Sequence, residues 1–105
     1  MDKSKIIQVE DVRREIARFD ALLRRYAVRR LSIFGSVSRG EASARSDVDM
    51  LVEFGRPQGL MELVALEHSL SRRLGRKVDL LTEAAISPLI RDRIHRDLQV
   101  VYEPA

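Results

Sequence analysis

Two aspartates stand two residues apart at the start of an apolar run, in the stretch DVDMLVEF. On a strand, Asp47 and Asp49 point to one face, while the alternate apolar residues point to the other. Carboxylates this close repel each other, and a divalent cation between them removes the conflict. Oxygen ligands favour Mg²⁺, with Mn²⁺ as a substitute. Alternatively, the same sequence pattern could reflect two solvated aspartates at the start of a strand, without a metal.

A third carboxylate, Asp79, lies in a second apolar run, KVDLLT. If this strand lies beside the first, Asp79 completes a cluster of three with Asp47 and Asp49. Three carboxylates on adjoining strands are one way to hold two Mg²⁺ ions, which then clamp the attacking and leaving oxygens of a phosphoryl or nucleotidyl transfer. Taken alone, Asp79 also fits a surface position on an edge strand.

The pair Gly35-Ser36 supplies groups that suit a phosphate. Glycine lets the backbone approach a ligand closely, and the serine hydroxyl adds a hydrogen-bond donor. Arg39 adds a planar cation that matches phosphate oxygens. A turn glycine followed by a helix-capping serine explains the pair equally well. The loop is not a Walker sequence, because GxxxxGK[ST] is absent.

The elements that must position these residues follow from the hydrophobic spacing. Helices are expected over Val9–Tyr26, over Leu60–Leu74 with Gly75 ending it, and from Ser87-Pro88 to about Leu98. Strands are expected over Leu31–Phe34, Asp47–Phe54, Lys77–Thr82 and Gln99–Tyr102. This alternation predicts an α/β (α+β) fold, with helices packed on one short mixed sheet.

Composition limits the classes of protein that remain. The 105 residues suit one domain spanning 1–105, and the absence of cysteine excludes disulfides, Cys-ligated zinc and iron–sulfur clusters. No apolar run approaches the roughly 20 residues that cross a bilayer, and no signal-peptide core is present. We therefore expect a cytoplasmic protein that is not associated with a membrane. The net charge of +3 suits phosphate-bearing partners, but the aromatic share of 5% argues against a base-stacking surface for nucleic acid.

The combined pattern resembles a known family. Gly35-Ser36, ten further residues and then Asp47-x-Asp49 match the G-S-x10-D-x-D signature of the DNA polymerase β-like nucleotidyltransferase superfamily. With KVDLL and the short length, the chain resembles the minimal nucleotidyltransferases over roughly residues 12–102. By that resemblance the catalytic and metal-binding residues are Asp47, Asp49 and Asp79, and the nucleotide-binding residues are Gly35, Ser36 and Arg39.

The resemblance also implies a reaction. ATP is the substrate, two Mg²⁺ ions are held by the three aspartates, and an acceptor hydroxyl attacks the α-phosphate and releases pyrophosphate. By that resemblance, Asp47 and Asp49 would bridge both ions, and Asp79 would complete the catalytic metal site and help to deprotonate the acceptor. Gly35 and Ser36 hold the β- and γ-phosphates.

The chain is too short to carry its own acceptor-binding domain, which implies a partner. In the resembled family that partner is a helical HEPN-domain protein, often a ribonuclease toxin, and AMP is moved onto one of its tyrosines, so that the transferase acts as an antitoxin. The alternative is an antitoxin that neutralises the HEPN partner by binding alone. An antibiotic nucleotidyltransferase usually carries an additional helical domain, and a nucleic-acid-binding protein would bind with steep salt dependence without nucleotide.

Overall fold

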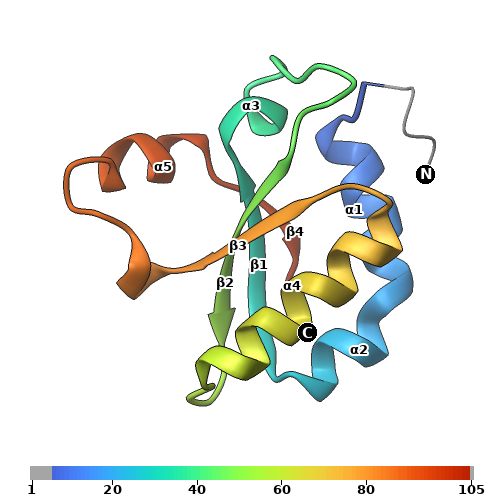
Figure 1. Cartoon of the computed structure of the whole chain (residues 1–105), viewed down its shortest axis with the longest axis vertical. Coiled ribbons are helices and arrows are strands. Elements are labelled where there is room, and N and C mark those ends of the chain that lie inside the picture. The colour runs from blue at the N-terminus through green and yellow to red at the C-terminus, as the bar shows by residue number, and fades with distance from the viewer. Residues whose placement is uncertain (1–5, 105) are drawn as a thin grey trace.

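The computed structural model describes residues 6–104 and forms a four-stranded mixed sheet (Figure 1). Its strands are β1 (Val28–Phe34), β2 (Val48–Phe54), β3 (Val78–Thr82) and β4 (Gln99–Tyr102). Their order across the sheet is β3-β2-β1-β4. β1 is antiparallel to both β2 and β4, whereas β2 and β3 are parallel. The sequence-based prediction of a mixed sheet with four strands is confirmed, with β1 beginning three residues earlier than expected.

Helices connect these strands and cover both faces of the sheet. They are α1 (Val9–Ile16), the 3₁₀ turn η1 (Ala17–Phe19), α2 (Asp20–Arg25), α3 (Gly35–Ser38), α4 (Leu60–Leu74), the 3₁₀ turn η2 (Glu83–Ala85) and α5 (Arg91–Asp97). The expected bounds of α4 are confirmed. Gly75 ends this helix in the left-handed region, with φ +67°, where a residue without a side chain has no steric penalty.

The prediction of one continuous helix over Val9–Tyr26 is wrong. Residues 17–19 tighten into the 3₁₀ turn η1, and Phe19 leaves helical geometry at φ −110° and ψ 22°. Asp20 then begins α2, and its Oδ1 accepts a hydrogen bond of 2.7 Å from the Tyr102 hydroxyl. The tertiary contact with β4 therefore accompanies a break that the helical spacing does not reveal.

The expected start of the last helix at Ser87-Pro88 is also wrong. The backbone N–H of Ile90 donates to the Ser87 carbonyl at 3.1 Å, which closes a separate turn, and Ile90 itself has φ −120° and ψ 0°. The helix α5 begins only at Arg91, whose Nη2 donates to the Ile86 carbonyl at 3.3 Å. Serine and proline thus shape a turn here instead of a helix start.

Two hydrophobic clusters lie on opposite faces of the sheet. The larger cluster joins α1, α2 and α4 to the face that carries Val48, Met50 and Val52. The smaller cluster lies under α5 and η2 and consists of Phe34, Leu51, Ile86 and Ile94, with Leu81 and Leu98 packed against it. Figure 1 shows α5 on the opposite side of the strands from α1 and α2. Because side chains alternate along a strand, Asp49 shares the face of the smaller cluster.

Within residues 6–104, no helix has the length and apolar character that crossing a membrane requires.

Candidate active site

Asp49 lies at the centre of the candidate site, on the second residue of β2. In the register of the sheet it is opposite Phe34, the last residue of β1, and opposite Asp79 of β3. It is half-buried, as is Asp79, while Asp47 is exposed. The prediction that the strand of Asp79 lies beside the strand of Asp49 is therefore confirmed, and the parallel pairing puts both carboxylates at the same level of the sheet.

Gly35 closes the other side of Asp49. It follows β1 directly and begins α3, with φ +77°, a backbone conformation that L side chains rarely adopt. A Cβ atom at this position would lie 2.5 Å from Asp49 Oδ2, which is closer than such atoms approach. Glycine is thus required here twice, by its backbone angle and by the closeness of the Asp49 carboxylate.

The negative charges of the site act on one another. Burial raises the pKa of the Asp49 carboxyl above its ordinary value, and the charges of Asp79 and Asp47 raise it further, while the positive charge of Arg39 opposes them. Lys77 partly balances Asp79, since its Nζ lies 3.8 Å from Asp79 Oδ1. The site therefore carries a surplus of negative charge around Asp49.

The chemistry of these donors fits a divalent cation. Carboxylate oxygens are the ligands that Mg²⁺ prefers, and a cation among them would relieve the repulsion that adds to the effect of burial on the Asp49 pKa. In the described part of the chain, no three His, Cys, Asp or Glu side chains are gathered closely enough to form a ready metal-binding group. Carboxylates that repel one another are expected to splay apart, so metal binding by Asp47, Asp49 and Asp79 would include side-chain rotation.

Ser36 and Arg39 extend the site along α3. Ser36 follows Gly35 directly and is half-buried. The Arg39 guanidinium makes two ion pairs: its Nη1 lies 2.6 Å from Asp97 Oδ2, and its Nε lies 3.0 Å from Glu41 Oε2. The sequence singled out Ser36 and Arg39 but not Asp97, because its position 58 residues further along the chain gives no local signal of the contact.

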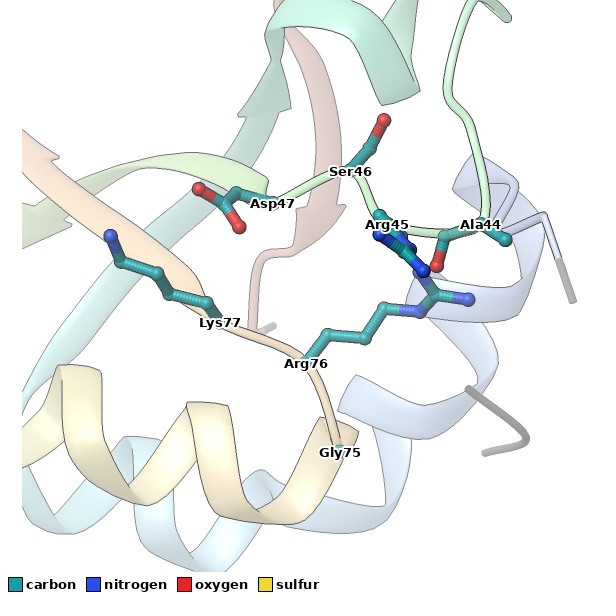
Figure 2. A pocket seen from close by; sticks show the side chains of 7 residues that line it. All are labelled: Ala44, Arg45, Ser46, Asp47, Gly75, Arg76 and Lys77. Carbon is teal, nitrogen blue, oxygen red and sulfur yellow. The ribbon is translucent and has the colours of Figure 1, made fainter. Parts of the chain in front are cut away.

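A pocket of about 300 Å³ opens beside Asp47, at the end of the sheet where β2 and β3 begin. Its lining residues are Ala44, Arg45, Ser46, Asp47, Gly75, Arg76 and Lys77. Figure 2 shows Lys77 reaching toward Asp47 while Arg45 and Arg76 lie together on the other side. Arg76 is buried, and its Nη1 donates to the Ala44 carbonyl at 2.9 Å. The pocket is therefore basic apart from Asp47, which it shares with the carboxylate site.

The pocket was not predicted from the sequence, although one signal pointed to it. Arg76 and Lys77 form a basic pair that on its own fits a solvated surface. Lys77, however, precedes Asp79 by two residues, so the strand period places it on the same face as that carboxylate. The site thus combines an anionic centre with cations on two flanks, Arg39 near β1 and Lys77 near β3. Such a combination can bind a metal–phosphate complex between the cations.

Comparison with known proteins gives a family and a fold. Residues 15–101 match the family described as nucleotidyltransferase domain. A protein of Methanocaldococcus jannaschii that is provisionally named a protein adenylyltransferase is 42% identical over 88 residues, which are 84% of this chain and 91% of that protein.

Solved structures share the fold. A structure described provisionally as a minimal nucleotidyltransferase superposes with a TM-score of 0.73 and 32% identity, over 89% of this chain and 95% of the other. A second structure, of a tri-AMPylated Shewanella oneidensis HEPN toxin in complex with MNT antitoxin, has a TM-score of 0.65 and 18% identity, over 89% of this chain and 73% of the other. At that identity the second likeness concerns the fold alone.

Proposed function

The chain belongs to the nucleotidyltransferase domain family, and from this membership we propose that it transfers AMP from ATP to a tyrosine hydroxyl of a HEPN-domain toxin and so acts as its antitoxin. The observation that carries the proposal is the position of Asp49, which lies between Asp79 on one neighbouring strand and Gly35 at the end of the other. This arrangement suits a nucleotide whose triphosphate extends over α3 and whose α-phosphate reaches the carboxylates.

The phosphate side of the site is formed by Gly35, Ser36 and Arg39. Because Gly35 has no side chain, the Asp49 carboxylate lies close to the start of α3, where the phosphates would bind. The Ser36 hydroxyl donates a hydrogen bond to a phosphate oxygen, and the Arg39 guanidinium supplies positive charge one turn further along the chain. These contacts would hold the β- and γ-phosphates so that the bond to the α-phosphate points away from α3.

The transfer itself breaks one phosphorus–oxygen bond and forms another. The acceptor oxygen attacks the α-phosphorus, the bond from this phosphorus to the oxygen that bridges to the β-phosphate breaks, and pyrophosphate leaves. The acceptor proton passes to the Asp79 carboxylate or to water. Asp47, Asp49 and Asp79 would hold Mg²⁺, which when bound neutralises charge on the α-phosphate and on the leaving pyrophosphate.

The acceptor would approach from the side of β3, because the phosphates occupy the side of α3. The basic pocket beside Asp47 lies on that flank, which favours an acceptor protein with acidic residues near the target hydroxyl. Docking of a whole protein also holds the hydroxyl near the α-phosphorus, and such proximity supplies much of the rate. A tyrosine suits the reaction, since its phenol has a pKa of about 10 and loses its proton more readily than an aliphatic hydroxyl.

The names of similar proteins support both the activity and the partner. The relative from M. jannaschii is named for protein adenylylation, and the Shewanella oneidensis structure pairs an AMPylated HEPN toxin with an MNT antitoxin. Since the reaction needs ATP and Mg²⁺, we propose the cytoplasm as its compartment. An antitoxin that silences the HEPN partner by contact alone is the alternative.

Isotope labelling tests the reaction type. The protein is incubated with its HEPN partner and with ATP labelled either at the α-phosphate or at the γ-phosphate. AMP transfer predicts that the partner retains the α label and never the γ label. Retention of the γ label would identify a kinase-type reaction, and retention of neither label by a partner that is nevertheless silenced would favour the binding-only alternative.

Ser36→Ala should weaken nucleotide binding without changing the fold. The variant loses one hydrogen bond to a charged acceptor, which is worth roughly 1.5–3 kcal/mol, or about ten- to a hundredfold in affinity. Calorimetric titration with Mg²⁺ and a non-hydrolysable ATP analogue measures the effect. Ser69→Ala, on the half-buried side of α4 and away from the carboxylates, is the matched control. Equal affinities of the Ser36 variant and the wild type would remove Ser36 from the phosphate site.

A further inference from the structure

The end of α5 is tied to α3 by several polar contacts. The Ser38 hydroxyl donates a hydrogen bond to the backbone carbonyl of Asp97. Gln99 Nε2 donates to the Ser38 carbonyl at 2.8 Å and to its hydroxyl oxygen at 3.0 Å. Arg39, the residue after α3, places its Nη1 2.6 Å from Asp97 Oδ2. The short segment of residues 97–99 therefore holds both the last residue of α3 and the arginine that follows it.

These contacts lead back to the carboxylate site. The backbone N–H of Arg39 donates to the Gly35 carbonyl at 3.1 Å, which sets Arg39 one helical turn after Gly35. Gly35 in turn abuts Asp49, whose Oδ2 would lie 2.5 Å from a Cβ at that glycine. Three successive contacts thus connect Asp97 with Asp49, although the two residues lie on different elements.

The helix that carries Asp97 does not explain this residue. Asp97 is the last residue of α5, where a carboxylate opposes the helix dipole instead of complementing it. Its side chain is only 15% exposed, and a carboxylate so far removed from water is costly unless it is paired. The pairing with Arg39 meets this need, so the contact with the arginine accounts for Asp97, and the helix α5 does not.

We propose that Asp97 is a positioning residue that holds the Arg39 guanidinium ready for the phosphates of the nucleotide. The inference rests on the proposed function, in which Arg39 binds the triphosphate. Asp97 accepts a hydrogen bond from Arg39 Nη1, and Glu41 accepts one from Arg39 Nε. Within residues 6–104 the remaining Arg39 Nη2 has no hydrogen-bond partner. An arginine fixed in this way binds a phosphate oxygen without first losing its rotamer freedom, which is worth about two- to tenfold in affinity.

A double-mutant cycle tests the role of Asp97. Affinity for Mg²⁺ and a non-hydrolysable ATP analogue is measured by calorimetry for the wild type, Arg39→Ala, Asp97→Asn and the double variant. Asp97→Asn should weaken binding about two- to tenfold in the presence of Arg39 and have no further effect in its absence. Asp97→Glu, which keeps the charge, should recover part of the loss. Asp92→Asn on the same helix is the matched charge control and should bind like the wild type.

Each other outcome decides against a specific claim. Wild-type affinity of Asp97→Asn, or the same loss with and without Arg39, overturns the positioning role, the latter because it indicates a general structural effect. If the wild type itself does not bind nucleotide, the proposed function is wrong. The first two outcomes concern Asp97 alone and do not contradict the proposed function.

A measurement on the wild type covers the case in which Asp97 variants do not fold. The Nε–H resonance of Arg39, assigned with Arg39→Lys, should be resolved without nucleotide and should shift when Mg²⁺ and the ATP analogue are added. An averaged resonance without nucleotide, or one that nucleotide leaves unchanged, would contradict the proposal.

Discussion

Asp49→Asn should reduce AMP transfer by about a hundredfold or more, because several kcal/mol of transition-state stabilisation depend on the metal that this carboxylate would hold. Asp49 is the carboxylate between Asp79 and Gly35, so its loss affects both the metal and the position of the α-phosphate. Asparagine has nearly the same size, and the fold should remain. Steady-state transfer rates at saturating ATP, together with calorimetric binding of the Mg²⁺–nucleotide complex, measure the effect.

The same variant should be more stable than the wild type when no metal is bound. The pKa of Asp49 is raised in the folded protein from its ordinary value of 3.8, so the folded state holds this proton more tightly than the unfolded state. The stabilisation from the bound proton is fully present below the unfolded pKa and is lost as the pH rises through the folded pKa. At pH 7 the charged Asp49 therefore destabilises the fold, and asparagine removes that cost.

Thermal unfolding in the presence of a chelator tests whether Asp49→Asn is more stable than the wild type. The melting temperature of Asp49→Asn should exceed that of the wild type at pH 7, and the difference should shrink as the pH falls and the wild-type carboxyl takes up its proton. A variant that is less stable at pH 7, or one that retains wild-type transfer, would show that Asp49 is an ordinary structural residue of β2.

Gly35→Ala should abolish nucleotide binding, and it is the second large effect. The new Cβ would lie 2.5 Å from Asp49 Oδ2, so the carboxylate or the start of α3 must move. The positive φ of +77° adds a backbone cost of about 1–2 kcal/mol for a residue with a side chain. Calorimetry with the ATP analogue should detect no binding in the range where the wild type saturates.

Gly40→Ala distinguishes the two possible causes of lost nucleotide binding, which are the close contact with Asp49 and the backbone strain. Gly40 has a similar φ of +72°, but nothing lies within 4 Å of a Cβ at this position. This control should therefore lose only the stability that the backbone strain costs and should keep its affinity for nucleotide. If both variants lose binding equally, backbone strain explains the result, and the close contact between Gly35 and Asp49 has no special role.

Much of the fold could be predicted because its signals are local. The leucine spacing and the glycine after it define α4 to the residue, and the apolar runs around Asp49 and Asp79 define two strands. One error occurred where a tertiary contact accompanies a break in helical spacing, and the other occurred where a local turn takes the place of a helix start. The break before Asp20 accompanies its hydrogen bond with Tyr102, and the late start of α5 follows a turn closed at Ser87.

The candidate site also has features that follow from local sequence signals and features that do not. The adjacency of Asp49 and Asp79 follows from strand alternation once the strands pair. The contact between Arg39 and Asp97 and the pocket formed by Arg45, Arg76 and Lys77 were not predicted, since each joins segments that only the folded chain brings together. A single sequence contains the residue types of such contacts but not their distances.

The intact mass of the HEPN partner is the most direct test of the central claim. After incubation with this protein, ATP and Mg²⁺, the partner should gain about 329 Da, the mass of one AMP group added covalently, or a multiple of it. Tryptic fragmentation should place the addition on a tyrosine, and the Asp47→Asn, Asp49→Asn double variant should leave the partner at its original mass. A partner whose mass is unchanged by the wild-type protein, while its toxicity is still suppressed, would contradict AMP transfer and show that binding alone neutralises it.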